Sequence, residues 1–140
     1  MSALAQLDKK VFEAASIDLP IMEMLQYQAE IAALRYTIGH ELAVSEMKML
    51  RAKEKSEMHE LKTRLVLQSS DKKLSSTKAA DLVRDRDDTE LLRLGAIEAK
   101  GEHTRLKQAL DTSDSMLVSL AQRIKRQEND EMTSKYQQMR

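Results

Sequence analysis

Thirteen positions between Leu82 and Ile124 alternate steps of three and four residues without a break. They are Leu82, Asp85, Thr89, Leu92, Ala96, Ala99, His103, Leu106, Leu110, Ser113, Leu117, Leu120 and Ile124. Residues at this spacing form a stripe along one side of an α-helix, and so narrow a stripe can only be buried against another helix. Because the stripe is apolar from Leu106 onward and weak at Asp85 and Thr89, we expect tight packing at its C-terminal end and loose packing at its N-terminal end.

The composition also favours long helices. The chain has 140 residues, of which 3 are Gly, 1 is Pro, 3% are aromatic and 33% are charged, and these values are typical of helices rather than of sheets joined by turns. The absence of Cys excludes disulfides and thiol chemistry. No run of about 18 apolar residues is present, so we expect a cytoplasmic protein that does not contact a membrane.

The predicted fold class is all-α: a single domain built as a long helical hairpin with coiled-coil-like packing and assembled into a homo-oligomer. Residues 1–17 form a short N-terminal helix or arm, and residues 18–127 form the hairpin. Its first helix covers 20–68, because Asp18 can cap the free amides of the helix start and Pro20 is tolerated in the first turn. Its connector covers 69–77, and its second helix covers 78–127. A polar tail follows at 128–140. More than 75% of the residues should be helical.

The first long helix carries its own stripe of spaced small and apolar residues. The stripe comprises Leu25, Ala29, Ala32, Tyr36, Gly39, Ala43, Met47, Leu50, Glu54, Met58, Leu61 and Leu65. Its extra four-residue steps shift the phase from seven toward eleven residues, which predicts a straighter helix or a bend near Gly39. We expect this stripe to be the packed face of the helix.

The apolar end of the second helix is longer than one partner helix with an interrupted stripe can cover. We therefore expect a homo-oligomer larger than a dimer, held together by knobs-into-holes packing. The candidate interface residues are Leu106, Leu110, Leu117, Leu120 and Ile124.

Signals for catalysis, metals and cofactors are weak. His40-Glu41 and His59-Glu60 each begin a zinc-protease pattern, but Val44 and Thr63 occupy the positions of the second His. The three Gly residues are isolated, so no glycine-rich phosphate loop is present. The acidic cluster from Asp85 to Glu90 alternates with Arg residues, which favours local ion pairs over a cation site. We expect a protein that is not an enzyme, with no cofactor and no metal site.

Residues 46–78 are unusually basic, with 9 basic and 5 acidic residues. Lysine and arginine side chains contact phosphates, and the hydroxyl groups scattered through this stretch can donate hydrogen bonds to phosphate oxygens. This pattern indicates single-stranded nucleic acid as a ligand, although stacking aromatics are missing from it. Ordinary solvation of a helix surface is the alternative explanation.

Several short segments resemble one protein family in order and spacing. They are Asp18 with Ile21, Leu25-Gln26-Tyr27 with Ala29 and Tyr36, Met49-Leu50-Arg51 with Lys55, and Leu61-Lys62-Thr63-Arg64-Leu65 with Ser69. This pattern is similar to UvsY, the recombination mediator family of T-even-type phages. The resemblance implies a helical ring-like homo-oligomer in the host cytoplasm that binds single-stranded DNA and helps a RecA-type recombinase displace a single-strand-binding protein.

The resemblance places DNA binding at Lys62 and Arg64, and less directly at Lys55. Lys72 and Lys73 in the connector are added as supporting contacts, because they follow the end of the helix. A protein of another class stays open as the alternative. It is an oligomeric coiled-coil interaction protein, such as a phage inhibitor or assembly scaffold, that binds a protein partner through Met-rich helix faces and binds no DNA.

Overall fold

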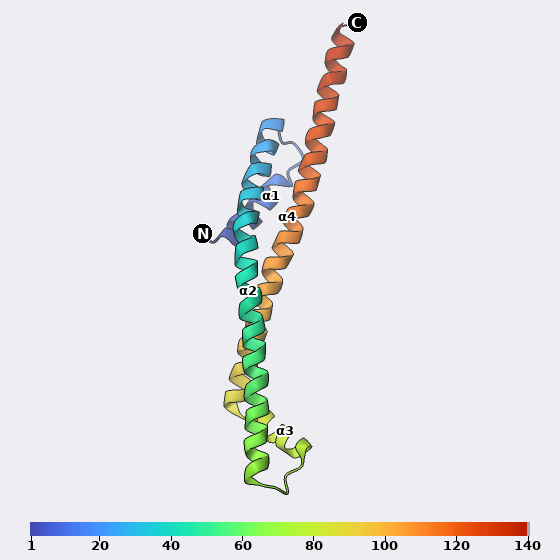
Figure 1. Cartoon of the computed structure of the whole chain (residues 1–140). Helices are drawn as coiled ribbons and strands as arrows, with labels where there is room; N and C mark the ends of the chain where they lie inside the picture. Colours follow the sequence, from blue (N-terminus) through green and yellow to red (C-terminus); the bar gives the residue numbers. More distant parts are fainter. Residues whose placement is uncertain (140) are drawn as a thin grey trace. The chain divides into compact units, whose positions relative to one another are not determined.

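The computed structural model describes residues 1–139, and this part of the chain is all-α (Figure 1). Its four helices are α1 (Ala3–Ala14), α2 (Ile21–Ser70), α3 (Ser76–Arg84) and α4 (Asp87–Met139). Helices account for 89% of the chain, and residues 1–139 contain no strand. The predicted all-α class and the predicted helix content above 75% are confirmed.

Several helix boundaries differ from those expected. α2 begins after Pro20, whose carbonyl accepts the first helical hydrogen bond from the N–H of Met24 at 3.0 Å. It continues to Ser70, so the connector shrinks to residues 71–75. α4 continues to Met139 through the region expected to be a polar tail.

The helix expected over 78–127 is interrupted at Asp85 and Arg86. Ser75 caps the start of α3, because its Oγ accepts a hydrogen bond from the N–H of Lys78 at 3.2 Å. Three members of the acidic cluster, Asp87, Asp88 and Glu90, then lie in the first turn of α4, where carboxylates interact favourably with the free N–H groups of a helix start. The cluster therefore marks a helix N-terminus, which the spacing of the apolar stripe did not reveal.

The described chain divides into two compact units. Unit 1 consists of Met1–Glu41 and the chain from Arg105 onward. Its core is mainly apolar and is built from Leu7 and Ala14 of α1, Met24, Ile31 and Ile38 of α2, and Leu106, Ala109, Leu120 and Ile124 of α4, with the polar Ser113 also buried. Arg123 holds the end of α1 by donating hydrogen bonds to the carbonyl oxygens of Ala14, at 2.8 Å, and of Ser16.

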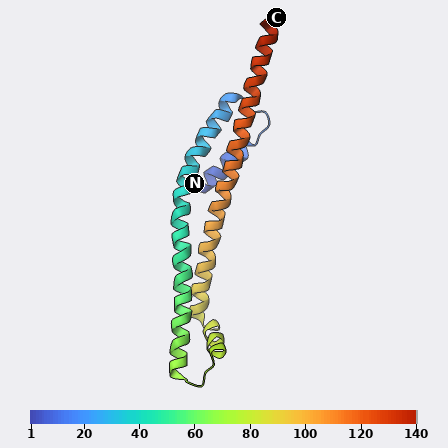
Figure 2. The same ribbon diagram turned by 45° about the vertical axis from the view of Figure 1, so that its right-hand side comes forward.

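Unit 2 consists of Leu42–Thr104 and contains the end of α2, all of α3 and the start of α4. Figure 2 shows α3 beside the C-terminal end of α2. α2 and α4 run antiparallel here, since Ser45 contacts His103 and Glu60 contacts Arg93. The buried side chains are small or polar: Ala79 and Val83 from α3, with Ser45, Ser56 and Thr89. Unit 2 is therefore held by less apolar burial than unit 1.

The packed face of α2 is not the one expected. In unit 1 the buried residues Met24, Ile31 and Ile38 are seven residues apart. In unit 2 the same interval leads to buried Ser45 and to half-buried Ala52 and His59. The expected stripe is largely exposed, for example at Leu25, Tyr36, Met47, Leu50, Met58, Leu61 and Leu65. Because the stripe of α4 repeats every seven residues, it matches the seven-residue row of α2 rather than the stripe with eleven-residue phasing.

Candidate nucleic-acid interface

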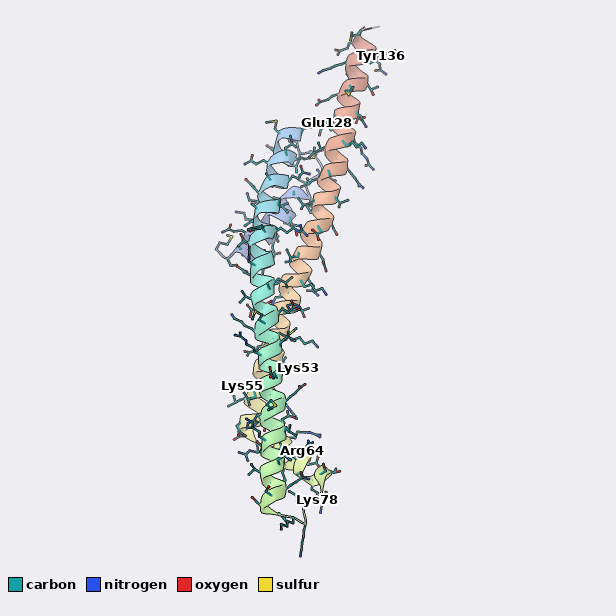
Figure 3. All side chains as sticks on the ribbon, in the orientation of Figure 1. Lys53, Lys55, Arg64, Lys78, Glu128 and Tyr136 are labelled. Carbon is teal, nitrogen blue, oxygen red and sulfur yellow. The ribbon has the colours of Figure 1, made fainter. Side chains whose placement is uncertain are left out.

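Four cations lie on one exposed side of α2 in unit 2. Lys48, Arg51, Lys55 and Lys62 are separated by three, four and seven residues, spacings that return to the same side of a helix. At about 1.5 Å per residue the row is roughly 21 Å long. Figure 3 labels Lys55 on α2, together with Lys53 and Arg64 of the same helix.

The cations of this row are not neutralised by carboxylates. Within residues 1–139, no ion pair involves Lys48, Arg51, Lys55 or Lys62. Lys53, which lies on another side of α2, approaches Glu57 at 4.0 Å. Unpaired, solvated cations can exchange their counterions for phosphates, so this row is suited to binding a polyanion.

The structure brings some of the predicted DNA-binding residues together and separates another. Lys55 and Lys62 share the exposed row. Arg64 is half-buried and lies on the opposite side of α2, because two residues correspond to about 200° around a helix. There it lines a depression with Glu57, Glu60 and Leu61 of α2, Ala80, Val83 and Arg84 of α3, and Arg93 of α4. Lys62 and Arg64 therefore do not form one contact surface.

Lys72 and Lys73 lie in the short connector directly after α2, and both are exposed. Asp71 shapes this connector: its side chain accepts a hydrogen bond from the N–H of Lys73 at 3.0 Å, and its carbonyl accepts one from Leu74 at 3.1 Å. The connector thus adds two cations at the end of α2. Lys48 and Arg51 are not among the predicted DNA-binding residues, although their spacing from Lys55 is a signal that would have identified them.

The residues expected at an oligomer interface lie within the chain's own packing in unit 1. Leu106, Leu120 and Ile124 are buried, and Leu110 and Leu117 are half-buried. Three of the five are therefore covered by the chain itself. These three belong to the core of unit 1, and the assignment of the five residues to an interface between subunits stays a prediction.

The ionisable groups of unit 2 with shifted pKa values belong to ion pairs. The hydrogen bond from Arg93 lowers the pKa of Glu60, and the hydrogen bond from Arg86 lowers the pKa of Asp88. The Nε2 atom of His59 lies 3.4 Å from Oδ2 of Asp88. Across residues 1–139, no three His, Asp or Glu side chains are grouped so that they could hold a metal ion.

No helix in the described part of the chain combines the length and apolar character needed to cross a membrane. Comparisons of the chain with protein-family models, curated proteins and solved structures find no match. A functional assignment therefore depends on the residues of this chain alone.

Proposed function

We propose that this chain is a non-catalytic, single-stranded DNA-binding accessory protein that acts as a homo-oligomer in the cytoplasm. One observation carries the proposal: the unpaired cation row of Lys48, Arg51, Lys55 and Lys62 on the exposed side of α2. Lys72 and Lys73 extend this positive surface into the connector.

The chemistry of the row favours contacts with the nucleic-acid backbone over reading of bases. Its side chains are cations that bind phosphates, and no aromatic residue occurs between Lys48 and Lys73 to stack on a base. Each phosphate contact on a single strand contributes about 0.7 to the slope of the logarithm of the binding constant against the logarithm of the salt concentration. A single chain makes few such contacts, so binding is weak unless several copies act on one strand.

The biological role follows from the resemblance to recombination mediators. In that role the protein helps a RecA-type recombinase displace a single-strand-binding protein, and both are proposed partners. We also propose that α2 and α4 form a long helical hairpin with coiled-coil-like packing, on which DNA and protein partners would be held together. Catalysis is not required, because binding and delivery are the work of such an accessory protein.

A fluorescence anisotropy titration tests the DNA-binding function. The probe is a long unstructured oligothymidine measured at several low salt concentrations. The double variant K55Q/K62Q should bind more weakly and with a smaller salt slope than the unmodified protein. The matched control K107Q/K125Q removes two exposed charges from α4 in unit 1 and should retain the slope.

The second candidate function is that of a coiled-coil interaction protein, such as a phage inhibitor or assembly scaffold, that binds a protein partner and no DNA. The exposed apolar stripe of α2 favours it, because contiguous apolar residues on a helix surface are typical of protein-binding sites. This candidate replaces the first if the unmodified protein shows no salt-dependent binding to the oligonucleotide.

A further inference from the structure

α2 contains an internal eleven-residue repeat in unit 2. Residues 46–56 and 57–67 match at five positions: Glu46 with Glu57, Met47 with Met58, Leu50 with Leu61, Arg51 with Lys62, and Lys53 with Arg64. Eleven residues make just over three whole turns of a helix, so each matched pair occupies nearly the same angular position. The repeat therefore places one pattern of apolar and charged residues twice along the same side of α2.

The apolar members of the repeat form a stripe that the chain leaves largely exposed, although Leu61 also borders the depression beside α3. Met47, Leu50, Met58, Leu61 and Leu65 are between 40% and 55% exposed. On the other side of the helix, Ser45 and Ser56 are buried against the rest of unit 2. The more apolar of the two faces of α2 is thus the one that faces outward, and a partner helix would remove it from water.

The charges beside the stripe differ between its two flanks. Arg51 and Lys62 lie on one flank, together with Lys55, and Glu46 and Glu57 lie on the other. All five side chains are exposed. The 4.0 Å approach of Lys53 to Glu57 joins two highly exposed groups, which leaves Glu57 able to change partner.

This arrangement fits a second copy of the same helix in one orientation. When two helices pair in parallel and in register, a residue on one flank faces the opposite flank of its partner about five positions further along. That offset joins Glu46 to Arg51 and Glu57 to Lys62 of the second copy, twice over by symmetry. In an antiparallel pair the basic flank of one helix would face the basic flank of the other, and the two acidic flanks would also face each other, so the like charges would repel.

We propose that the stripe from Met47 to Leu65 is a self-association surface on which a second copy of this chain docks in parallel and in register. The proposal deepens the homo-oligomer part of the proposed function and does not depend on DNA binding. It also replaces the α4 stripe as the site of association. At the rim of the pair Arg51 and Lys62 form exposed ion pairs, which a phosphate can replace, so all four cations of the row stay available to phosphates.

Glu54 gives the proposal a distinctive consequence. It is exposed and lies within the stripe, at the position that Leu65 occupies in the second repeat. In a parallel, in-register pair the Glu54 carboxylates of the two copies face each other, which opposes association. Replacing Glu54 with Leu should therefore tighten the pair, an effect opposite to that of most substitutions in an interface.

Cysteine cross-linking in the absence of DNA tests the orientation, because the chain has no natural cysteine. Single variants M47C and L65C, near the two ends of the stripe, should each form a disulfide-linked homodimer under mild oxidation. K53C, on another side of α2, should not. In an antiparallel pair neither variant alone would form a disulfide-linked homodimer, but a mixture of the two would form a link between position 47 of one copy and position 65 of the other. That result would overturn the proposal.

Sedimentation equilibrium without DNA tests the surface itself. L61K should weaken self-association by about tenfold or more, and E54L should strengthen it by a similar factor. V66K is the matched control, since Val66 is an exposed apolar residue of α2 away from the stripe. A monomer at all concentrations up to the millimolar range, or equal association for L61K and V66K, would overturn the proposal. Because no DNA is present, either failure is distinct from a failure to bind oligonucleotide.

Discussion

Arg93 of α4 donates a hydrogen bond from Nε to Oε1 of Glu60 on α2, with 2.6 Å between the two atoms. The bond joins two helices within unit 2 and lowers the pKa of Glu60. Both side chains are about one-third or more exposed, so water screens the pair and its contribution to stability is modest.

The first prediction concerns this pair. E60Q should lower the free energy of unfolding by roughly 0.5–1 kcal/mol at pH 7. Because the folded pKa of Glu60 lies below its ordinary value of 4.5, the contribution is fully present above that value and is lost as the pH falls through the folded pKa. Urea denaturation should show a larger difference between the two proteins at pH 7 than at pH 3. E98Q, at an exposed position of α4, is the control and should unfold like the unmodified protein at both pH values.

The second prediction concerns the core of unit 1. Leu120 is 0% exposed, so L120A should destabilise the protein by about 2–5 kcal/mol through lost burial and an unfilled cavity. V118A, two residues earlier and exposed, should change the stability by less than about 0.5 kcal/mol. Thermal denaturation followed by circular dichroism measures both. Equal effects of the two substitutions would show that Leu120 is not part of a core within the chain.

The third prediction concerns a polar contact inside unit 2. Ser45 is buried, donates a hydrogen bond from Oγ to the carbonyl of Leu42 at 2.8 Å, and lies 3.2 Å from Nδ1 of His103. With the hydroxyl proton used, Nδ1 is left as the donor to the Ser45 oxygen. S45A should cost about 1 kcal/mol, because this donor loses its partner. The double variant S45A/H103L should recover most of that loss. Chemical denaturation of the unmodified protein, S45A, H103L and the double variant measures the coupling.

The fourth prediction separates the two residues that the sequence placed together for DNA binding. K62Q should reduce the affinity for an oligothymidine probe and reduce the salt slope by about 0.7, the value for one phosphate contact on a single strand. R64Q should leave the slope nearly unchanged, because Arg64 is half-buried on the opposite side of α2. Anisotropy titrations at matched salt concentrations compare the two variants. Equal losses of slope would place Arg64 in the DNA contact.

The sequence was a reliable guide to the class of structure and to the stripe of α4. From Thr89 to Ile124 every position of that stripe is buried or half-buried. The break at Asp85 and Arg86 was missed, because the spacing of the stripe continues in phase across it. In the structure Asp85 caps the end of α3, and α4 begins at Asp87. Lys55 and Lys62 could be placed on one side of α2 from their spacing, whereas the partners of Arg64 come from α3 and α4 and are not visible in the spacing of α2.

By itself the sequence determined that the chain is helical and where its long amphipathic segments lie. These properties depend on residue spacing along a single helix, which the order of residues fixes directly. Only the tertiary structure decided which face of α2 is buried. The seven-residue row with Met24, Ile31, Ile38 and Ser45 is buried, and the more apolar stripe from Met47 to Leu65 is exposed. The physical reason is that a helix face can be buried only where its residue spacing matches that of the partner helix. The packed residues of α4 repeat every seven residues, and the row on α2 with the same spacing stays aligned with them.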